Sequence, residues 1–441
     1  MGIWDNIFGG KAKQTQLPLF ETEFGRFTDA NKTKSQYEAW DKSVSHFENR
    51  DYQAALEEFI HYIQNFSGNN IIKENISSYI IFQGSKSILL STKNGQLSAS
   101  CKVATTDQLH IGFMRRLLDL NYELKYVRYA LTPDNVVTLL FETSLEDASP
   151  YKLYFALKEL AIHADKQDDL LIHEFEFLKP IHSGKIEIPE QEELNQKFQF
   201  FISKIETALT QYDSGKLKAE QYPSAGAYVL LALLYKLDYL VRPEGKLMDR
   251  LEQMHKAYFG QNQKNILQRL KQFKDDLTQL RRLQEPEVKK DLYHSVFTFG
   301  FTSPANISAS FELIDREMRN IQWYTDNQYD EYIIAILEYA IGLSLFNFAL
   351  PEVIKELFTI VYRITESDYF DHIKGYDKLV NINGLPDKST IRQELYRIEK
   401  KYKNEYPAMV MDVKVLKYEN IGVFLVSYIL MIRQIQFQKT K

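Results

Sequence analysis

The chain has 441 residues, more than one hydrophobic core normally supports, so two domains are expected. Hydrophobic residues make up 44% and charged residues 26%, which is typical of folded globular proteins and excludes wholesale disorder. The formal net charge of −5 argues against a broad basic field that binds nucleic acid through its phosphates. Cys101 is the single cysteine, so intramolecular disulfides and cysteine-based zinc sites are excluded and a reducing cytoplasm is the expected location.

Residues 1–33 are expected to form a flexible arm, because a short apolar cluster is followed there by glycines, lysines and other polar residues. Within it, Gln16-Leu17-Pro18-Leu19-Phe20 resembles the peptide by which bacterial replication and repair proteins bind the sliding clamp. The resemblance implies partner binding by Gln16, Leu17, Leu19 and Phe20, with a leucine and an aromatic ring entering apolar pockets. The alternative is that Leu17, Leu19 and Phe20 pack on the protein's own domain.

Two apolar runs at helical spacing, 37–47 and 52–63, flank Asn49-Arg50-Asp51 and predict a helical hairpin. The second run resembles half of a tetratricopeptide repeat through Tyr52, Ala55 and Phe59. Such repeats need about three copies to bury a continuous core. Because no neighbouring copy is found, a single hairpin is expected.

The next segment is rich in β-forming residues and predicts strands near 77–83, 85–92 and 96–104, with Asn94-Gly95 as a hairpin turn. Two further strands are predicted over 122–130 and 136–143, joined by a turn that contains Pro133.

Two helices alternate with these strands. The first is predicted over 107–120, with cap oxygens from Thr105, Thr106 and Asp107. Its expected apolar face consists of Leu109, Phe113, Leu117 and Leu118. The second is predicted over 151–168, and its expected inward-facing residues are Leu153, Phe155, Ala156, Leu160 and Ala161.

In order, residues 36–170 give a helix, three strands, a helix, two strands and a helix. This order, with the segments Ser91–Gln96 and Leu153–Leu160, resembles the YbjN-like family and the chaperones of type III secretion systems, which share one α+β fold. The resemblance covers about a third of the chain. It implies a module that holds partner proteins along exposed apolar surface, often as a dimer, without catalysis.

The α+β domain is expected to span residues 34–180, because Pro180, Gly184 and Pro189 place a boundary near 181–190. An all-α helical domain is predicted for 190–441, where proline-broken helical periodicity occurs at 191–213, 224–241, 244–258, 262–283, 308–323, 328–348, 351–364, 389–405 and 413–435. Two apolar stretches, 333–350 and 421–432, are interrupted or too short to span a membrane, so no transmembrane segment is expected.

Candidate metal ligands are few. Glu58/His61 and Glu252/His255 have the Glu-x-x-His spacing of carboxylate di-iron sites, which require both pairs and two more glutamates in one bundle. We interpret these pairs as coincidence. The cluster around Asp368, Asp371 and His372 matches no ligand set and is interpreted as a solvated loop.

Two further residues are candidates for chemistry. Glu338 lies in an apolar run, and we expect it to pair with a charged neighbour in preference to acting as a buried acid. Cys101 lies on the apolar side of an alternating strand, where a buried thiol is inert.

No residue is therefore assigned to catalysis, to a cofactor or to a metal. The sequence predicts a non-catalytic, protein-binding adaptor or chaperone-like protein whose partner is a protein, with a homodimer left open. Two alternatives stay open: a metal-dependent enzyme with its site in the helical half, and a structural homo-oligomeric scaffold.

Overall fold

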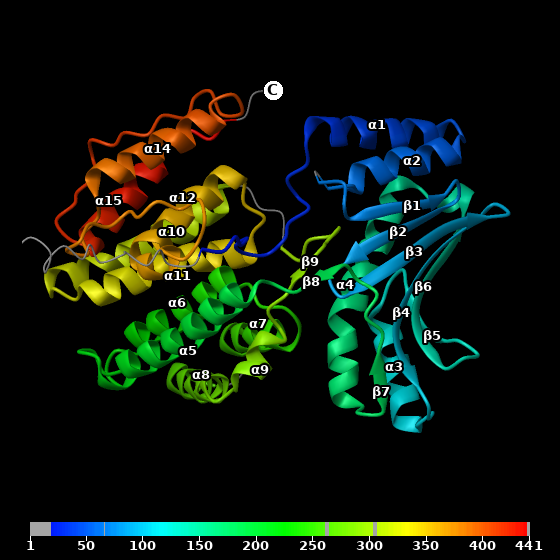
Figure 1. Cartoon of the computed structure of the whole chain (residues 1–441), viewed down its shortest axis with the longest axis horizontal. Helices are drawn as coiled ribbons and strands as arrows, with labels where there is room; N and C mark the ends of the chain where they lie inside the picture. The colour runs from blue at the N-terminus through cyan, green and yellow to red at the C-terminus, as the bar shows by residue number, and fades with distance from the viewer. Residues whose placement is uncertain (1–18, 66, 261–263, 303–306, 439–441) are drawn as a thin grey trace, which may run out of the picture. The chain divides into compact units, whose positions relative to one another are not determined.

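The computed structural model describes residues 19–438 except 66, 261–263 and 303–306 (Figure 1). The chain divides into two compact units. The first unit contains residues 1–23, 190–200 and 359–441, and the second contains 24–189 and 201–358. The division into an arm and two domains stays a prediction.

The second unit begins with the expected helical hairpin, α1 (Lys34–Glu48) and α2 (Tyr52–Ile63). Thr33 starts α1 with a reciprocal capping box to Gln36, and the Asp51 carboxylate starts α2 by accepting the Ala54 N–H at 3.3 Å. Arg50 makes the turn between them with a left-handed φ of 64°. The hairpin prediction is confirmed.

An antiparallel sheet follows, with the strand order β1-β2-β3-β4-β6-β5 and with β7 paired to β4. The strands are β1 (Ile71–Asn75), β2 (Ser78–Gln83), β3 (Lys86–Lys93), β4 (Gln96–Thr106), β5 (Arg128–Leu131), β6 (Val136–Ser144) and β7 (Leu178–Pro180). Asn94 and Gly95, both at positive φ, join β3 to β4 as expected. The α+β class is confirmed, whereas β1 and β7 were not predicted.

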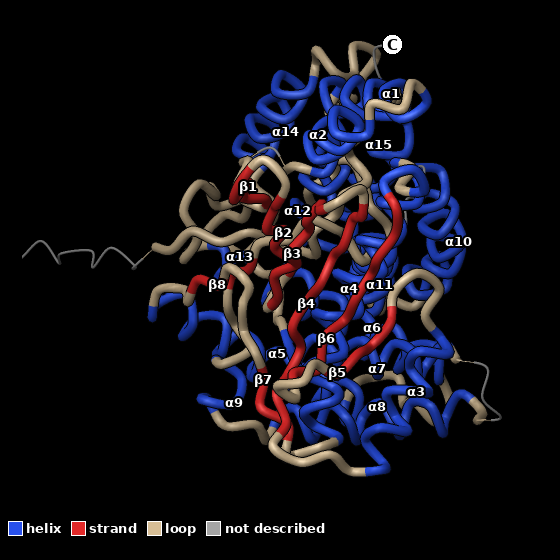
Figure 2. Tube along the Cα trace, turned by 90° about the vertical axis from the view of Figure 1, so that its right-hand side faces the viewer, coloured by secondary structure: helices blue, strands red, loops and turns tan. Residues whose placement is uncertain are grey.

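Helices α2, α3 (Ile111–Glu123) and α4 (Pro150–Glu174) bury one face of this sheet. Phe59, Phe113 and Leu157 from the three helices join strand residues such as Leu90 and Leu139 in a single core. Cys101 belongs to this core and is buried, which confirms its expected place. None of the described helices lies on the opposite face, and Figure 2 looks onto its strands, with helices behind them.

Helix α3 differs from its prediction at both ends. It starts at Ile111 after His110, which makes no side-chain capping bond. The Thr106 hydroxyl, which was expected to cap the helix, instead donates to the Gln108 carbonyl at 2.6 Å and accepts the Gln108 N–H at 3.2 Å. It runs on to Glu123, through the first residues of the expected strand 122–130. The Glu159 carboxylate then accepts the N–H groups of residues 125–127 and fixes the path into β5.

The rest of the second unit is helical, apart from the short pair β8 (Ile186–Glu187) and β9 (His294–Ser295). Its helices are α6 (Pro223–Val241), α7 (Gly245–Phe259), α8 (Ile266–Arg281), α9 (Glu285–Lys289), α10 (Ile307–Asp326) and α11 (Asp330–Asn347), and α5 (Gln191–Ser214) enters it from Phe201 on. Glu338 on α11 pairs with Lys236 on α6 at 2.8 Å, as expected.

Among the described residues, α6 is the one helix long and apolar enough to cross a membrane. It is a core helix, because 83% of its apolar window is buried inside the protein.

The first unit contains the start of α5, the end of α12 (Glu352–Thr365), α13 (Ser367–Phe370), α14 (Lys388–Tyr402) and α15 (Ile421–Gln434). The buried Arg363 guanidinium on α12 pairs with Glu394 on α14 and also donates to the Asp377 carbonyl. These contacts tie α12 and α14 to the intervening loop.

Candidate functional site

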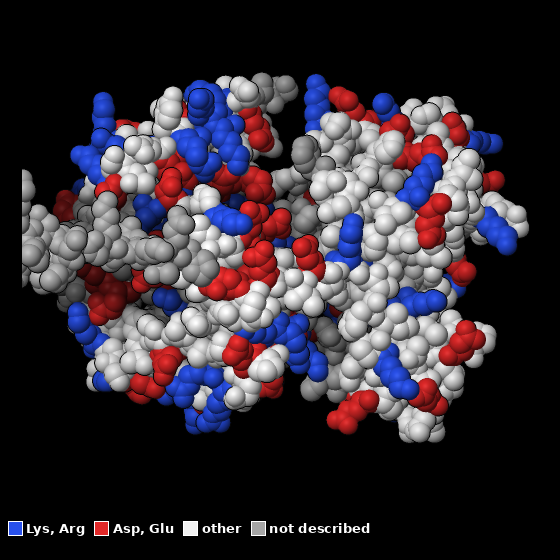
Figure 3. Space-filling view, viewed as in Figure 1, with Lys and Arg blue, Asp and Glu red and all other residues white. Residues whose placement is uncertain are grey.

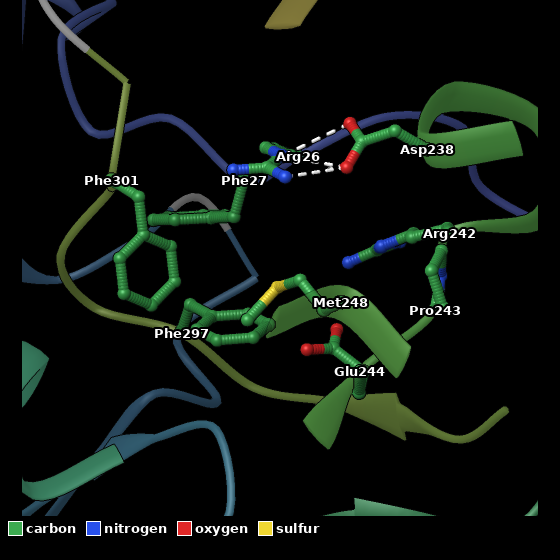
Figure 4. Close-up of a pocket in the computed structure, with 9 residues that line it drawn as sticks. All are labelled: Arg26, Phe27, Asp238, Arg242, Pro243, Glu244, Met248, Phe297 and Phe301. Carbon is green, nitrogen blue, oxygen red and sulfur yellow. Dashed lines mark hydrogen bonds and ion pairs between the residues drawn. The ribbon is translucent and has the colours of Figure 1, made fainter. Parts of the chain in front are cut away.

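A small cavity lies inside the second unit, beside the extended segment that precedes α1. Its lining combines charged and apolar side chains (Figure 4): Arg26, Phe27, Asp238, Arg242, Pro243, Glu244, Met248, Phe297 and Phe301. Because a cavity with charged walls is where an active site is normally sought, its geometry decides whether this cavity could be one.

Arg26 is the centre of this polar cluster. Its guanidinium donates to both carboxylate oxygens of Asp238, at 3.0 Å each from Nε, and to Glu252 Oε1 at 2.8 Å from Nη1. Lys166 from α4 donates to both oxygens of Glu252 at 3.0 Å, and the Arg26 guanidinium lies 4.0 Å from the centre of the Phe346 ring. The cluster therefore joins α4, α6 and α7 through compensated buried charges, and it contacts α11 through the Phe346 ring.

The environment shifts the pKa values of Glu244, Glu252 and His255. Burial raises the pKa of Glu244 to about 7, against the opposing charges of Arg242 and Arg26. Burial alone would also raise the pKa of Glu252, but Arg26 and Lys166 outweigh it and lower that pKa to about 2. Burial, helped by the Arg26 charge, lowers the pKa of His255 to about 4.

The cavity is too small for a substrate. Its volume of about 20 Å³ is room for one water molecule, whereas small-molecule sites enclose roughly 300–1,000 Å³. A raised glutamate pKa without space for a reactant provides no catalytic site. The cluster acts as a structural joint between helices.

The candidate metal residues are not assembled either. His61 lies 3.6 Å from Glu58 on α2, whereas His255 Nδ1 lies 2.8 Å from the Tyr235 hydroxyl and Glu252 is held by Arg26 and Lys166. Nowhere in the described ranges do three His, Cys, Asp or Glu side chains form a group that could hold a metal ion. Asp371 pairs with Lys378 at 2.6 Å on a half-buried loop.

The arm motif is described only in part, because Gln16 and Leu17 lie outside the described residues. Leu19 is exposed, whereas Phe20 is 1% exposed. The Phe20 N–H donates to the His372 carbonyl at 3.0 Å, and its carbonyl accepts the Lys374 N–H at 2.8 Å. Phe20 thus occupies the protein's own first unit, as the packing alternative expects, while clamp binding stays a prediction.

The most unusual surface of the described chain is the outer side of α3. Ile111 is 89% exposed, Leu118 67% and Tyr122 93%, and Met114 is also exposed. At 100° per residue these four positions lie within an arc of about 80°. They form one continuous apolar stripe along the helix, which we call the α3 outer face.

The opposite side of α3 is apolar as well. Phe113, Leu117 and Leu120 are buried against the sheet. A surface helix normally carries an apolar stripe toward the core and polar residues outside, so the second apolar side of α3 departs from the usual pattern. Arg115 and Asp119, both exposed, border the stripe with one charge of each sign.

Three residues that were predicted to face the core are exposed instead. Leu109 and Leu118 were expected on the inner face of the helix, but both point outward, because α3 starts four residues later and its core face is set by Phe113, Leu117 and Leu120. Phe155 on α4 was also expected to face inward and is 54% exposed. The adjacent pair Leu117-Leu118 gave no signal for the outer face, because one helix face can bury two adjacent residues, as α2 does with Phe59 and Ile60.

A second apolar area lies on the helix-free face of the sheet. Ile72 pairs with Ile80 across β1 and β2, and Ile80 pairs with Leu89 across β2 and β3. Ile72 and Leu89 are exposed. In Figure 3 the surface over the α+β elements carries single charges of both signs, separated by uncharged area. On the side seen in Figure 3, neither sign of charge dominates over the α+β elements.

No protein-family model matches this chain, and no curated protein matches it in sequence. The relationship to YbjN-like proteins and secretion chaperones stays a prediction.

Proposed function

We propose that this chain is a non-catalytic adaptor or chaperone-like protein of the cytoplasm, which binds a partner protein through the α3 outer face. The observation that carries the proposal is the nearly complete exposure of Ile111 and Tyr122 on a helix whose other side already fills the core. Solvent exposure of such side chains is unfavourable, and burial under a partner removes it.

The size of the surface supports a specific complex. Large apolar side chains bury on the order of 200 Å² each, so the exposed fractions of Leu109 and the four stripe residues amount to roughly 700 Å². A standard protein interface buries about 800 Å² on each partner. The exposed Tyr122 at one end of the stripe and the mixed charges of Arg115 and Asp119 beside it fit the composition of such interfaces.

The order of helices and strands from α2 to α4 supports the chaperone-like part of the proposal. The sheet is covered by helices on one side only, and the apolar row Ile72–Ile80–Leu89 lies on its other side. A fold that leaves this much apolar surface uncovered fits a protein that holds another chain.

The test compares affinity purification of the full-length protein with that of Leu118→Asp/Tyr122→Asp. The matched control is Ile266→Asp/Leu267→Asp, which adds the same charges at exposed apolar positions of α8. We expect a stoichiometric partner that is retained by the control and lost from the α3 variant. The partner could also be a second copy of this chain. Light scattering would then give the α3 variant half the molecular mass of the unchanged protein, while the control keeps the full mass. Equal partners and equal masses for all three proteins would refute the proposal.

A further inference from the structure

Glu244 is a buried acid that forms no ion pair. It lies in the turn between α6 and α7 and is 6% exposed. Within the described chain, its carboxyl group has one hydrogen-bond donor, the Ser295 hydroxyl at the long distance of 3.5 Å. The neighbouring acids differ, because Arg26 donates to both Asp238 and Glu252, and in Figure 4 the dashed lines from Arg26 reach Asp238 but not Glu244. The surroundings of Glu244 therefore favour its protonated, uncharged form.

The charges around Glu244 do not reverse this preference. The charged and titratable groups on the elements packed around the turn are Arg26, Asp238, Arg242, Glu252, Asp291 and His294. The positive charges of Arg242 and Arg26 favour the ionised carboxylate, whereas the negative charge of Asp238 opposes it. Burial outweighs these charges and raises the pKa of Glu244 to about 7, so the carboxyl changes its charge near neutral pH.

The turn that carries Glu244 has an unfavourable backbone and is held at one point. Arg242 adopts a left-handed φ of 50°, which is costly for a residue with a side chain, and Gly245 follows at 54°. The Glu244 N–H donates to the Asp291 carbonyl at 2.8 Å, and the Leu247 N–H donates to the Asp291 carboxylate at 2.9 Å. Two hydrogen bonds to a single residue thus keep the turn in place.

Residues 291–299, which we call the connector, run from this turn to the sheet of the second unit. The Val296 carbonyl accepts the Gly84 N–H at 3.0 Å. The Gln83 side chain, at the end of β2, accepts the Phe299 N–H at 3.0 Å and donates to the Phe299 carbonyl at 3.1 Å. One end of the connector therefore binds the sheet, and its other end binds the α6–α7 turn.

The cavity beside Glu244 has room for the protonated form but not for a hydrated carboxylate. Its volume of about 20 Å³ holds one water molecule. An ionised carboxylate has two oxygens that accept about four hydrogen bonds, so its hydration requires that the turn moves away from the connector.

We propose that the α6–α7 turn and the connector form a pH-sensitive latch, which is closed while Glu244 is protonated and opens when Glu244 is ionised. On opening, the proton passes to water, the two hydrogen bonds to Asp291 break, and solvent reaches the carboxylate. The latch thereby couples pH to the attachment between the helices and the end of β2. It does not depend on a partner at the α3 outer face.

The experiment is hydrogen exchange of the full-length chain, followed by mass spectrometry at about pH 5.5 and about pH 8, with exchange times scaled to the intrinsic rate at each pH. Peptides that cover 242–249 and 291–299 report on the latch, and a peptide that covers 227–237 reports on the buried part of α6. The pKa of Glu244 falls from about 7 to 4.5 when the latch opens, so the opening equilibrium is expected to increase about 25-fold between the two pH values. At about pH 8 the latch peptides are expected to exchange at least about tenfold faster than the α6 peptide, because local opening needs less free energy than unfolding of the unit.

The test variant is Glu244→Gln, which keeps the shape of the side chain without a titrating proton. Glu187→Gln is the matched control, because Glu187 is an exposed acid on β8, the strand that pairs with β9 in the connector. We expect the pH response of the latch peptides to disappear in Glu244→Gln and to persist in Glu187→Gln. The other charged groups are the same in these proteins, so they do not account for a difference between them.

Three results would overturn the proposal. The first is equal protection of the latch peptides at both pH values in the unchanged protein. The second is exchange of the latch peptides no faster than that of the α6 peptide, because the turn would then open only when the whole unit unfolds. The third is the same pH response in Glu244→Gln. The first two are measured on the unchanged protein, so the test holds even if the variant fails to fold.

Discussion

Replacement of Glu244 by glutamine is expected to stabilise the second unit at alkaline pH. Burial raises the pKa of Glu244 from the usual 4.5 to about 7, so the folded protein disfavours the ionised carboxylate. The unfolded chain loses its proton near pH 4.5, whereas the folded chain keeps it until about pH 7. The stability of the native protein therefore falls as the pH rises across this window, and glutamine removes the effect.

The expected gain in unfolding free energy follows from the size of the pKa shift of Glu244. One pKa unit corresponds to about 1.4 kcal/mol, so the gain for Glu244→Gln is about 3 kcal/mol at about pH 8 and less than about 0.5 kcal/mol at about pH 4.5. The low pKa of His255 affects the unfolding free energy of both proteins equally, so it cancels from the difference between them. Glu48→Gln, at an exposed position of α1, is the control and is expected to show no pH-dependent gain.

The assay is urea unfolding followed by tryptophan fluorescence. In a Trp4→Phe background the remaining tryptophans, Trp40 and Trp323, both lie in the second unit and report on it alone. A Glu244→Gln protein that is destabilised at both pH values would refute the reasoning, because Glu244 would then be a bound carboxylate.

Three further outcomes are expected. Arg26→Met leaves Asp238 and Glu252 buried without their main partner, and urea unfolding is expected to show a loss of about 3–5 kcal/mol in the second unit. Phe20→Ala empties a buried site in the first unit and is expected to cost about 3–5 kcal/mol, measured by hydrogen exchange of residues 359–434. Leu117→Ala is expected to cost about 2–5 kcal/mol and the neighbouring Leu118→Ala less than about 0.5 kcal/mol by the same urea assay, and equal costs would contradict the assigned faces of α3.

Local patterns predicted most helices and the central strands. The turn at Asn94-Gly95 and the cap at Asp51 act through neighbouring residues, so their structure is readable from a short window. Strand β1 was missed because only two of its five residues are apolar and its pairing with β2 is decided by the rest of the sheet.

The candidate surfaces depend on information that a single sequence does not hold. Leu117 and Leu118 are chemically equivalent, and only the start of α3 at Ile111 decides which one faces the sheet. Arg26 and its partners are separated by more than 200 residues, so their cluster has no local signal. The pairing of Glu338 was predictable because an acid in an apolar run is costly unless it meets a cation.

The most direct test of the central claim is photo-crosslinking in the native host, with a photoreactive residue in place of Leu118 or, as the control, of the exposed Lys271 on α8. The account predicts a discrete covalent adduct with a protein at position 118 and none at position 271. The Leu118 adduct is also expected to disappear when Tyr122→Asp is added. No adduct at position 118, or the same adducts at both positions, would contradict protein binding through the α3 outer face.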